Sequence, residues 1–214
     1  MSSRDAPDPA EADLEFLLGR RERADAMADR LRRTAGWRGF SRDQANRLAD
    51  CFLAAMRSRA AAIGDDHDPA YLHPARTALI LLDDVGLQDA DVLYAAVVHD
   101  AVRPDLAMNA DDLRDLAGDR AADIIDLLPH PDADPAAIME TLVTLPAGVL
   151  ALYLASQLDL ARHLHLGDAA GWAAGHARVT GSLIRLAHRC HPLLAKRFER
   201  WAGAFRRRFL ERLD

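Results

Sequence analysis

The sequence predicts an all-α fold, and three observations support that prediction. Apolar residues recur at the helical spacing of three to four along almost the whole chain. No segment shows a convincing alternation of apolar and polar residues, which a half-buried strand requires. Half of the 214 residues are hydrophobic but only 6% are aromatic. The core should therefore consist mainly of Leu, Ala, Val and Ile, packed in a helical bundle with extra helices at both ends.

Net charge, cysteine usage and the N-terminus indicate which partners and which cell compartment to expect. The formal net charge of −6 disfavours general binding to DNA or RNA. Cys51 and Cys190 lie far apart and have no partners at metal-ligand spacing, which favours two small buried thiols in a reducing compartment. The N-terminus lacks the layout of a signal peptide, and no apolar run approaches the length of a membrane span. We expect a cytoplasmic protein with no membrane partner.

The first helices are predicted from charge patterning and a capping motif. Residues 1–10 are rich in Pro and Asp, which predicts disorder. Residues 11–34 should form a charged helix with a thin apolar stripe. A stronger helix is predicted over 41–63, because Ser41 and Gln44 fit a capping box.

Proline, glycine and capping residues divide the rest of the chain. After a polar loop at 64–71, Pro74 suits the first turn of a helix that Gly86 ends. Asp89 caps the next helix, which ends near Asp100. Another helix begins near Asn109 and is interrupted at Gly118, and one more begins at Asp134-Pro135. The last three helices are expected over 147–166, 169–189 and 192–213.

The helix that ends near Asp100 carries a histidine and a carboxylate on its apolar face. His99 continues the apolar row through Val92 and Ala96. Asp100 likewise continues the row through Val97. A buried ionised carboxylate is costly unless it is paired or binds a cation, and a histidine with a carboxylate suits Mn, Fe or Zn. The alternative is that Asp100 pairs with a histidine or arginine and only ends the helix.

A second histidine is expected beside this pair. His73 lies at the start of the preceding helix, and a short turn joins the two helices. Antiparallel packing would place the start of one helix beside the end of the other. His73, His99 and Asp100 can therefore converge on one divalent metal.

The segment YLHPARTALILLDDVGLQDADVLYAAVVHDAV resembles the HD superfamily of metal-dependent phosphohydrolases. Within that superfamily it is most similar to the hydrolase domains of the RelA/SpoT type and their small stand-alone relatives. His73-Pro74 and His99-Asp100 match the family's His-Pro and His-Asp pairs. Residues 113–128 and 152–164 resemble two later family segments. The resemblance covers about residues 50–166.

The resemblance implies both an architecture and a function. It implies an HD-like helical domain over 41–166, after a polar segment and helix over 1–40, with C-terminal helices over 167–214 packing on the same domain. The family's enzymes of this type remove the 3′-pyrophosphate from the alarmone (p)ppGpp with Mn. For this chain it implies a metal held by His73, His99 and Asp100, with Mn first and Fe, Co or Zn as alternatives.

The chain departs from the family pattern in its fourth metal ligand. The family supplies an Asp from its long helix, and the aligned residue here is Ser156. A serine hydroxyl is a poor ligand for a divalent cation. Asp159 lies one turn further along a similar face and is the candidate fourth ligand, in which case His163 could join it. The alternative is that Asp159 and His163 are ordinary polar helix positions.

The second departure affects the group that activates water. The family continues its His-Asp pair with Glu-Asp, whereas this chain has Arg103-Pro104. A cation cannot act as a general base. Asp105 is the carboxylate nearest to this position in the sequence. Asp100 and Asp105 are therefore the two candidate catalytic residues. The family's Lys and Arg near the metal-binding Asp are replaced by Tyr153 and Gln157.

Two further features bear on ligands and partners. Arg76 lies one turn after His73 and is the candidate to hold a substrate phosphate. The last helix is amphipathic, with Phe198, Trp201 and Phe205 on one side and arginines on the others. It could pack on its own domain or form a homodimer face, or bind an acidic partner or a membrane surface.

Two functions follow from these observations. One is metal-dependent hydrolysis of a nucleotide phosphoester or pyrophosphate, with (p)ppGpp-like alarmones as the first candidates. The alternative is a catalytically inactive HD-like domain, with no cofactor if its site is degenerate, that binds a nucleotide or a protein partner. A weaker third is a scaffold that acts through its C-terminal helix.

Overall fold

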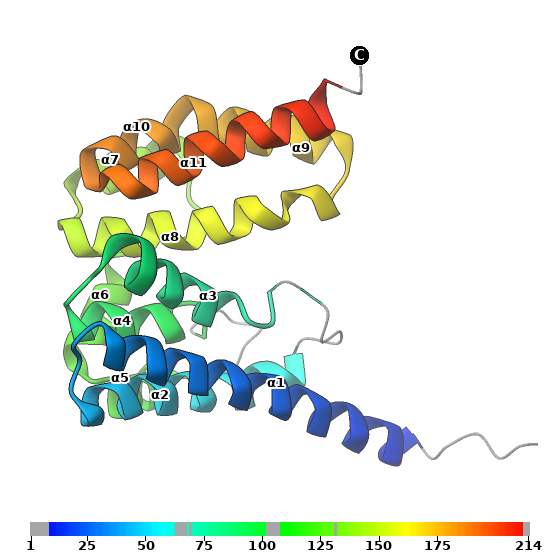
Figure 1. The fold of residues 1–214 in the computed structure, drawn as a ribbon, viewed down its shortest axis with the longest axis vertical. Helices are drawn as coiled ribbons and strands as arrows, with labels where there is room; N and C mark the ends of the chain where they lie inside the picture. The colour runs from blue at the N-terminus through cyan, green and yellow to red at the C-terminus, as the bar shows by residue number, and fades with distance from the viewer. Residues whose placement is uncertain (1–8, 63–67, 69, 102–107, 131, 212–214) are drawn as a thin grey trace, which may run out of the picture.

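The computed structural model describes residues 9–62, 68, 70–101, 108–130 and 132–211, and these residues form helices and turns with no strand among them (Figure 1). The all-α prediction is therefore confirmed. In chain order, the α-helices begin with α1 (Pro9–Trp37), α2 (Arg42–Ala62), α3 (His73–Ile80), α4 (Ala90–Val98), α5 (Ala110–Ala117) and α6 (Asp119–Asp126). They continue with α7 (Pro135–Thr144), α8 (Ala147–His163), α9 (Ala169–Arg178), α10 (Ile184–Cys190) and α11 (Pro192–Phe205). Shorter turns are the π-helical η1 (Leu81–Val85), η3 (Val179–Leu183) and η4 (Arg206–Leu210) and the 3-10 turn η2 (Leu164–Leu166).

Helix α8 lies between two groups of helices (Figure 1). On one side it packs against α3 and α4, and α4 in turn packs on α2 and α6. On the other side it contacts α10 and α11. A single buried apolar cluster runs through the described chain, from Leu31 in α1 through Leu154 in α8 to Phe198 in α11. The C-terminal helices therefore share one core with the helices that carry the His-Asp pair.

The predicted caps are present where two helices begin. The Gln44 backbone N–H donates to Ser41 Oγ at 3.2 Å and the Ser41 N–H donates to Gln44 Oε1 at 3.0 Å, which completes the capping box of α2. The Asp89 carboxylate accepts hydrogen bonds from the first turn of α4. Each cap satisfies backbone N–H groups that have no partner within the helix.

Two glycines allow the chain to turn where the sequence predicted helix ends. Gly86 has a φ of 68° and follows η1 directly, in the left-handed conformation that commonly ends a helix. Gly118 has a φ of 93° and separates α5 from α6. The first turn brings α4 back along α3, so the start of α3 meets the end of α4.

Several helix ends differ from the prediction. Helix α1 begins at Pro9, inside the segment predicted to be disordered, and continues to Trp37. The helix predicted over 147–166 keeps α geometry only to His163 and tightens into η2. The helices predicted over 169–189 and 192–213 contain the π-helical turns η3 and η4. A π turn takes up one residue more than an α turn without breaking the helix, so apolar periodicity does not reveal it.

None of the described helices combines the length and the apolar character needed to cross a membrane.

Candidate functional site

Three side chains that the sequence singled out meet where α3 begins and α4 ends. His73 is the first residue of α3, while His99 and Asp100 directly follow the last residue of α4. One ligand atom from each residue lies within 4.8 Å of the others. His73 and Asp100 are buried and His99 is half-buried. The predicted convergence of these three residues is therefore present in the structure.

The hydrogen bond of His99 fixes its ring. His99 Nδ1 lies 2.8 Å from the carbonyl oxygen of Ala96, one turn earlier in α4. A carbonyl can only accept, so Nδ1 carries the proton and donates it, and the lone pair of the neutral ring is on Nε2. Metal-binding histidines are commonly held in this way through their second nitrogen.

His73 is held from both sides by α8. Its Nδ1 donates to Asp159 Oδ2 at 2.8 Å, and its Nε2 lies 3.1 Å from Ser156 Oγ. When the ring is neutral, its proton is on Nδ1 facing Asp159, and Nε2 accepts from the Ser156 hydroxyl. The rings of His73 and His99 meet edge to face, with centroids 5.2 Å apart. Ser156 thus lies beside the nitrogen that is directed away from Asp159.

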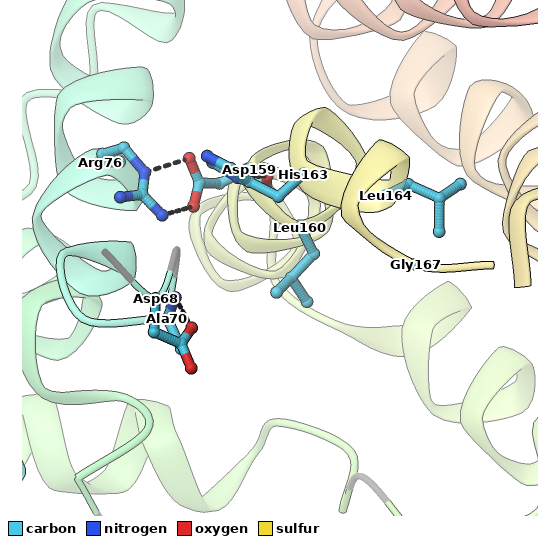
Figure 2. Close-up of a pocket in the computed structure, with 8 residues that line it drawn as sticks. All are labelled: Asp68, Ala70, Arg76, Asp159, Leu160, His163, Leu164 and Gly167. Carbon is cyan, nitrogen blue, oxygen red and sulfur yellow. Dashed lines mark hydrogen bonds and ion pairs between the residues drawn. The ribbon is translucent and has the colours of Figure 1, made fainter. Parts of the chain in front are cut away.

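Asp159 pairs with Arg76 (Figure 2) and also contacts the His73 ring. Arg76 Nε donates to its Oδ1 at 2.8 Å and Arg76 Nη2 to its Oδ2 at 2.9 Å. Burial acts to raise the pKa of the Asp159 carboxyl, but the hydrogen bonds from His73 and Arg76 outweigh it and hold that pKa below its ordinary value. The carboxylate is therefore ionised at neutral pH, and both of its oxygens accept hydrogen bonds.

These contacts show what two of the predicted site residues bind in the structure. Asp159 was the candidate fourth metal ligand, but its oxygens bind His73 Nδ1 and Arg76, and it does not belong to the group formed by His73, His99 and Asp100. Ser156, rather than Asp159, is the α8 residue beside His73 Nε2. Arg76 was the candidate phosphate ligand, and here its guanidinium forms a two-point pair with Asp159.

A cavity of about 1030 Å³ opens beside the three candidate ligands. His73, His99, Asp100 and Ser156 lie on its wall. Most of the rest of that wall is apolar, as in small-molecule sites generally, and its volume is at the upper end of the range for such sites. Polar side chains of the remaining wall are Arg114, Asp126, His130, Asp132, Tyr153, Gln157 and Arg178.

A smaller cavity of about 300 Å³ has the Arg76–Asp159 pair on its wall (Figure 2). Asp68 and Ala70 line it from before α3, Leu160 and His163 from the end of α8, and Leu164 from η2. The His163 ring is held by its own helix, since Nδ1 lies 2.9 Å from the Asp159 carbonyl oxygen. His163 is not part of the group formed by His73, His99 and Asp100.

Asp105, the second candidate catalytic residue, lies outside the described residues, as do Arg103 and Pro104.

Sequence reasoning missed the contribution of α9 to the larger cavity. Arg178, the last residue of α9, lines this cavity and donates from Nη2 to Gln157 Oε1 at 2.5 Å. It lies outside the segment that resembles the HD superfamily, and its contact depends on how the C-terminal helices pack on α8. Nothing in the local pattern around Arg178 distinguishes it from the other arginines of the C-terminal part.

No protein-family model matches this chain, and no curated protein sequence matches it either.

Proposed function

We propose that this protein is a metal-dependent phosphohydrolase with an HD-like domain, acting on a phosphoester or pyrophosphate bond of a nucleotide. The observation that supports the proposal most directly is the convergence of His73, His99 and Asp100 on the wall of a large cavity. The three residues come from the His-Pro and His-Asp pairs that carry the resemblance to the HD superfamily.

The residues present fit a divalent metal. Two imidazoles and one carboxylate form a donor set suited to Mn, Fe, Co or Zn, with Mn as the first candidate. His73 and His99 each donate from Nδ1 to an oxygen, so Nε2 is the nitrogen that would bind the metal. In His73 the metal would replace the hydrogen bond from the Ser156 hydroxyl to that nitrogen. When bound, a divalent cation lowers the pKa of a water molecule and polarises a phosphoryl oxygen.

The side chains around the proposed metal have separate roles. Asp159 orients the His73 ring, and Arg76 in turn fixes the Asp159 carboxylate. Asp100 supplies the negative charge of the ligand group. It is also the predicted catalytic carboxylate. Asp105 remains the predicted group that positions and deprotonates the attacking water.

The substrate class follows from the resemblance and from the size of the cavity. A volume of about 1030 Å³ is sufficient for a nucleotide. We therefore propose (p)ppGpp-like alarmones as the first substrates to test, ahead of other nucleotide phosphoesters and pyrophosphates.

A second candidate function is a catalytically inactive HD-like domain that binds a nucleotide or a protein partner. The contact that favours it is the Ser156 hydroxyl, 3.1 Å from His73 Nε2. The resemblance implies a carboxylate at this position, and a neutral hydroxyl binds a divalent cation far more weakly. A three-residue ligand group should hold a metal less tightly, and the chain could keep its cavity without turnover.

Titration calorimetry with Mn on chelator-stripped protein tests the proposal. Asp100→Ala should abolish Mn binding and leave the helical circular dichroism spectrum unchanged. Asp126→Ala, which removes a carboxylate from the same cavity wall outside the ligand group, should bind Mn like the wild type.

Turnover then separates the two candidate functions. With Mn, Fe, Co or Mg, the wild type should release phosphate or pyrophosphate from a nucleotide panel that includes ppGpp, and Asp100→Ala should not. Mn binding without turnover on any nucleotide would favour the inactive domain. Absence of Mn binding by the wild type would overturn the metal-dependent proposal.

A further inference from the structure

Arg178 and Arg114 both lie on the wall of the large cavity but differ in what they contact. Arg114 is paired with the carboxylates of Asp119, Asp123 and Asp126 at 3.2 to 3.8 Å. Arg178 instead donates to the neutral side-chain amide of Gln157. Among the described residues no carboxylate pairs with it.

Helix α8 connects Arg178 to the candidate metal ligands through two neighbouring residues, Ser156 and Gln157. Gln157 directly follows Ser156, whose hydroxyl contacts His73 Nε2. Tyr153 lies one turn before Gln157, and both side chains line the cavity. The cavity wall therefore carries Arg178, Gln157 and Tyr153 beside the group formed by His73, His99 and Asp100.

The Tyr153 hydroxyl can act as a donor in this setting. Burial raises its pKa above the ordinary value of 10, although the nearby Arg178 guanidinium partly opposes that shift. The phenol is therefore protonated at neutral pH. An anion in this part of the cavity would meet one guanidinium and one hydroxyl donor, and Gln157 could offer its amide N–H.

We propose that Arg178, supported by Tyr153 and Gln157, binds a phosphate group of the cavity's ligand. The inference rests on the proposed function for the class of ligand, a nucleotide, but not on hydrolysis or on a bound metal. A guanidinium forms two parallel hydrogen bonds to phosphate oxygens, which are stronger than its bond to a neutral amide. Arg178 therefore exchanges Gln157 Oε1 for phosphate when the ligand binds.

This assignment gives the C-terminal helices a part in ligand recognition. The ligands proposed for the metal come from α3 and the end of α4, whereas the phosphate contact comes from the last residue of α9. The ligand would thus lie between the two groups of helices that α8 separates.

Calorimetry in the presence of a chelator tests the proposal without the metal. The probes are GDP, inorganic pyrophosphate and guanosine. Arg178→Gln should weaken GDP and pyrophosphate binding by about tenfold or more, the scale expected for losing charged hydrogen bonds. Arg178→Lys, which keeps the charge but not the two-point geometry, should fall between the wild type and Arg178→Gln.

Arg185→Gln is the matched control, because Arg185 is exposed on α10 and does not line the cavity. It should bind GDP like the wild type. Tighter binding of GDP than of pyrophosphate identifies a nucleotide as the ligand, whereas equal binding identifies a free phosphate anion. Equal GDP affinity of the wild type and Arg178→Gln would overturn the assignment. Failure of the wild type to bind GDP or pyrophosphate would also overturn it. So would a loss of GDP affinity in Arg185→Gln as large as that in Arg178→Gln.

A parallel Mn titration keeps this result separate from the proposed function. Arg178→Gln should bind Mn with the wild-type affinity, since Arg178 is not part of the ligand group. If the wild type binds no Mn but binds phosphate through Arg178, only the metal-dependent function fails. If Mn binds and Arg178→Gln has no effect on GDP, only the phosphate assignment fails.

Discussion

His73 and Asp159 are 86 residues apart in the chain, yet His73 Nδ1 lies 2.8 Å from Asp159 Oδ2. The contact joins the first residue of α3 to the buried face of α8. Arg76 completes it by donating two hydrogen bonds to the same carboxylate. One buried anion thus fixes the ring of a candidate metal ligand and holds two helices together.

Asp159→Asn should weaken metal binding without removing a proposed ligand. The amide cannot accept the His73 proton as strongly as a carboxylate does, so the ring loses its fixed orientation and some of its basicity. We expect Mn affinity to fall by about 10- to 100-fold, the usual range for changes to the groups that hold a ligand. Calorimetry at pH 7.5 would measure it. An unchanged affinity would show that Asp159 does not position His73.

The same variant should lower the stability of the fold in a pH-dependent way. Losing the charged hydrogen bonds should cost about 2–3 kcal/mol of unfolding free energy at pH 7. Because the folded-state pKa of Asp159 lies below its ordinary value of 3.8, its contribution is complete above that pH and is lost as the pH falls through the folded-state value. Urea unfolding at several pH values should therefore show the difference between wild type and variant shrinking below about pH 4.

Ser156→Asp should strengthen metal binding. Ser156 is buried and its hydroxyl lies 3.1 Å from His73 Nε2, so a carboxylate here would face the candidate ligand group. We expect Mn affinity to rise by about tenfold or more, since even changes outside the ligand shell have effects of that size. Ser156→Ala, which adds no ligand, should stay close to the wild type. A rise in both variants would mean that removing the hydroxyl, rather than adding a ligand, is responsible.

Both cysteines should react slowly with thiol reagents in the folded protein. Neither forms a disulfide, and burial raises the pKa of both the Cys51 and the Cys190 thiol to about 11. At pH 8 only about one thiol in a thousand is then ionised. Labelling with a chromogenic disulfide should be slow in native buffer and reach two thiols per chain in guanidinium chloride. Rapid native labelling of Cys51, which is fully buried, would contradict this structure.

Asp84→Asn should loosen the C-terminal helices. Asp84 at the end of η1 pairs with Arg197 of α11 and lies 3.9 Å from Arg162 of α8. Both arginines are more than one third exposed, so solvent screens the loss and we expect a cost of about 1–2 kcal/mol. Hydrogen exchange should then be faster across α11.

Asp83→Asn is the control for that experiment. Asp83 neighbours Asp84 but is half exposed and pairs with Arg38, which directly follows α1. It should cost less than 1 kcal/mol, roughly the value of a surface pair. Equal effects of the two variants would show that Asp84 has no special role in holding α11.

Local signals were sufficient to predict most of the helices. Caps such as Ser41 and Asp89, and glycines such as Gly86, act through hydrogen bonds and backbone angles within a few residues, so the sequence displays them directly. The π-helical turns were not predictable in this way. They depend on how each helix meets its neighbours, and an extra residue in one turn changes the apolar spacing too little to be noticed.

The site was predictable in part for a related reason. His73, His99 and Asp100 lie at the ends of two helices joined by a short turn, so their convergence follows from local connectivity. Asp159 and Arg178 reach the site from distant parts of the chain. Which face of α8 meets His73 depends on a rotation of about 100° per residue, and spacing alone could not choose between Ser156 and Asp159 as the residue beside Nε2.

The π-helical turn Leu81–Val85 makes this stretch of the gene sensitive to a change in length. An in-frame deletion of one codon there would let the turn close as an ordinary α-helix and rotate the following residues by about 100°. Asp84 would then face away from Arg162 and Arg197, and α4 would return along α3 at a different angle. Point substitutions at the five positions preserve that path, so codon loss should be selected against more strongly than exchange of any one side chain.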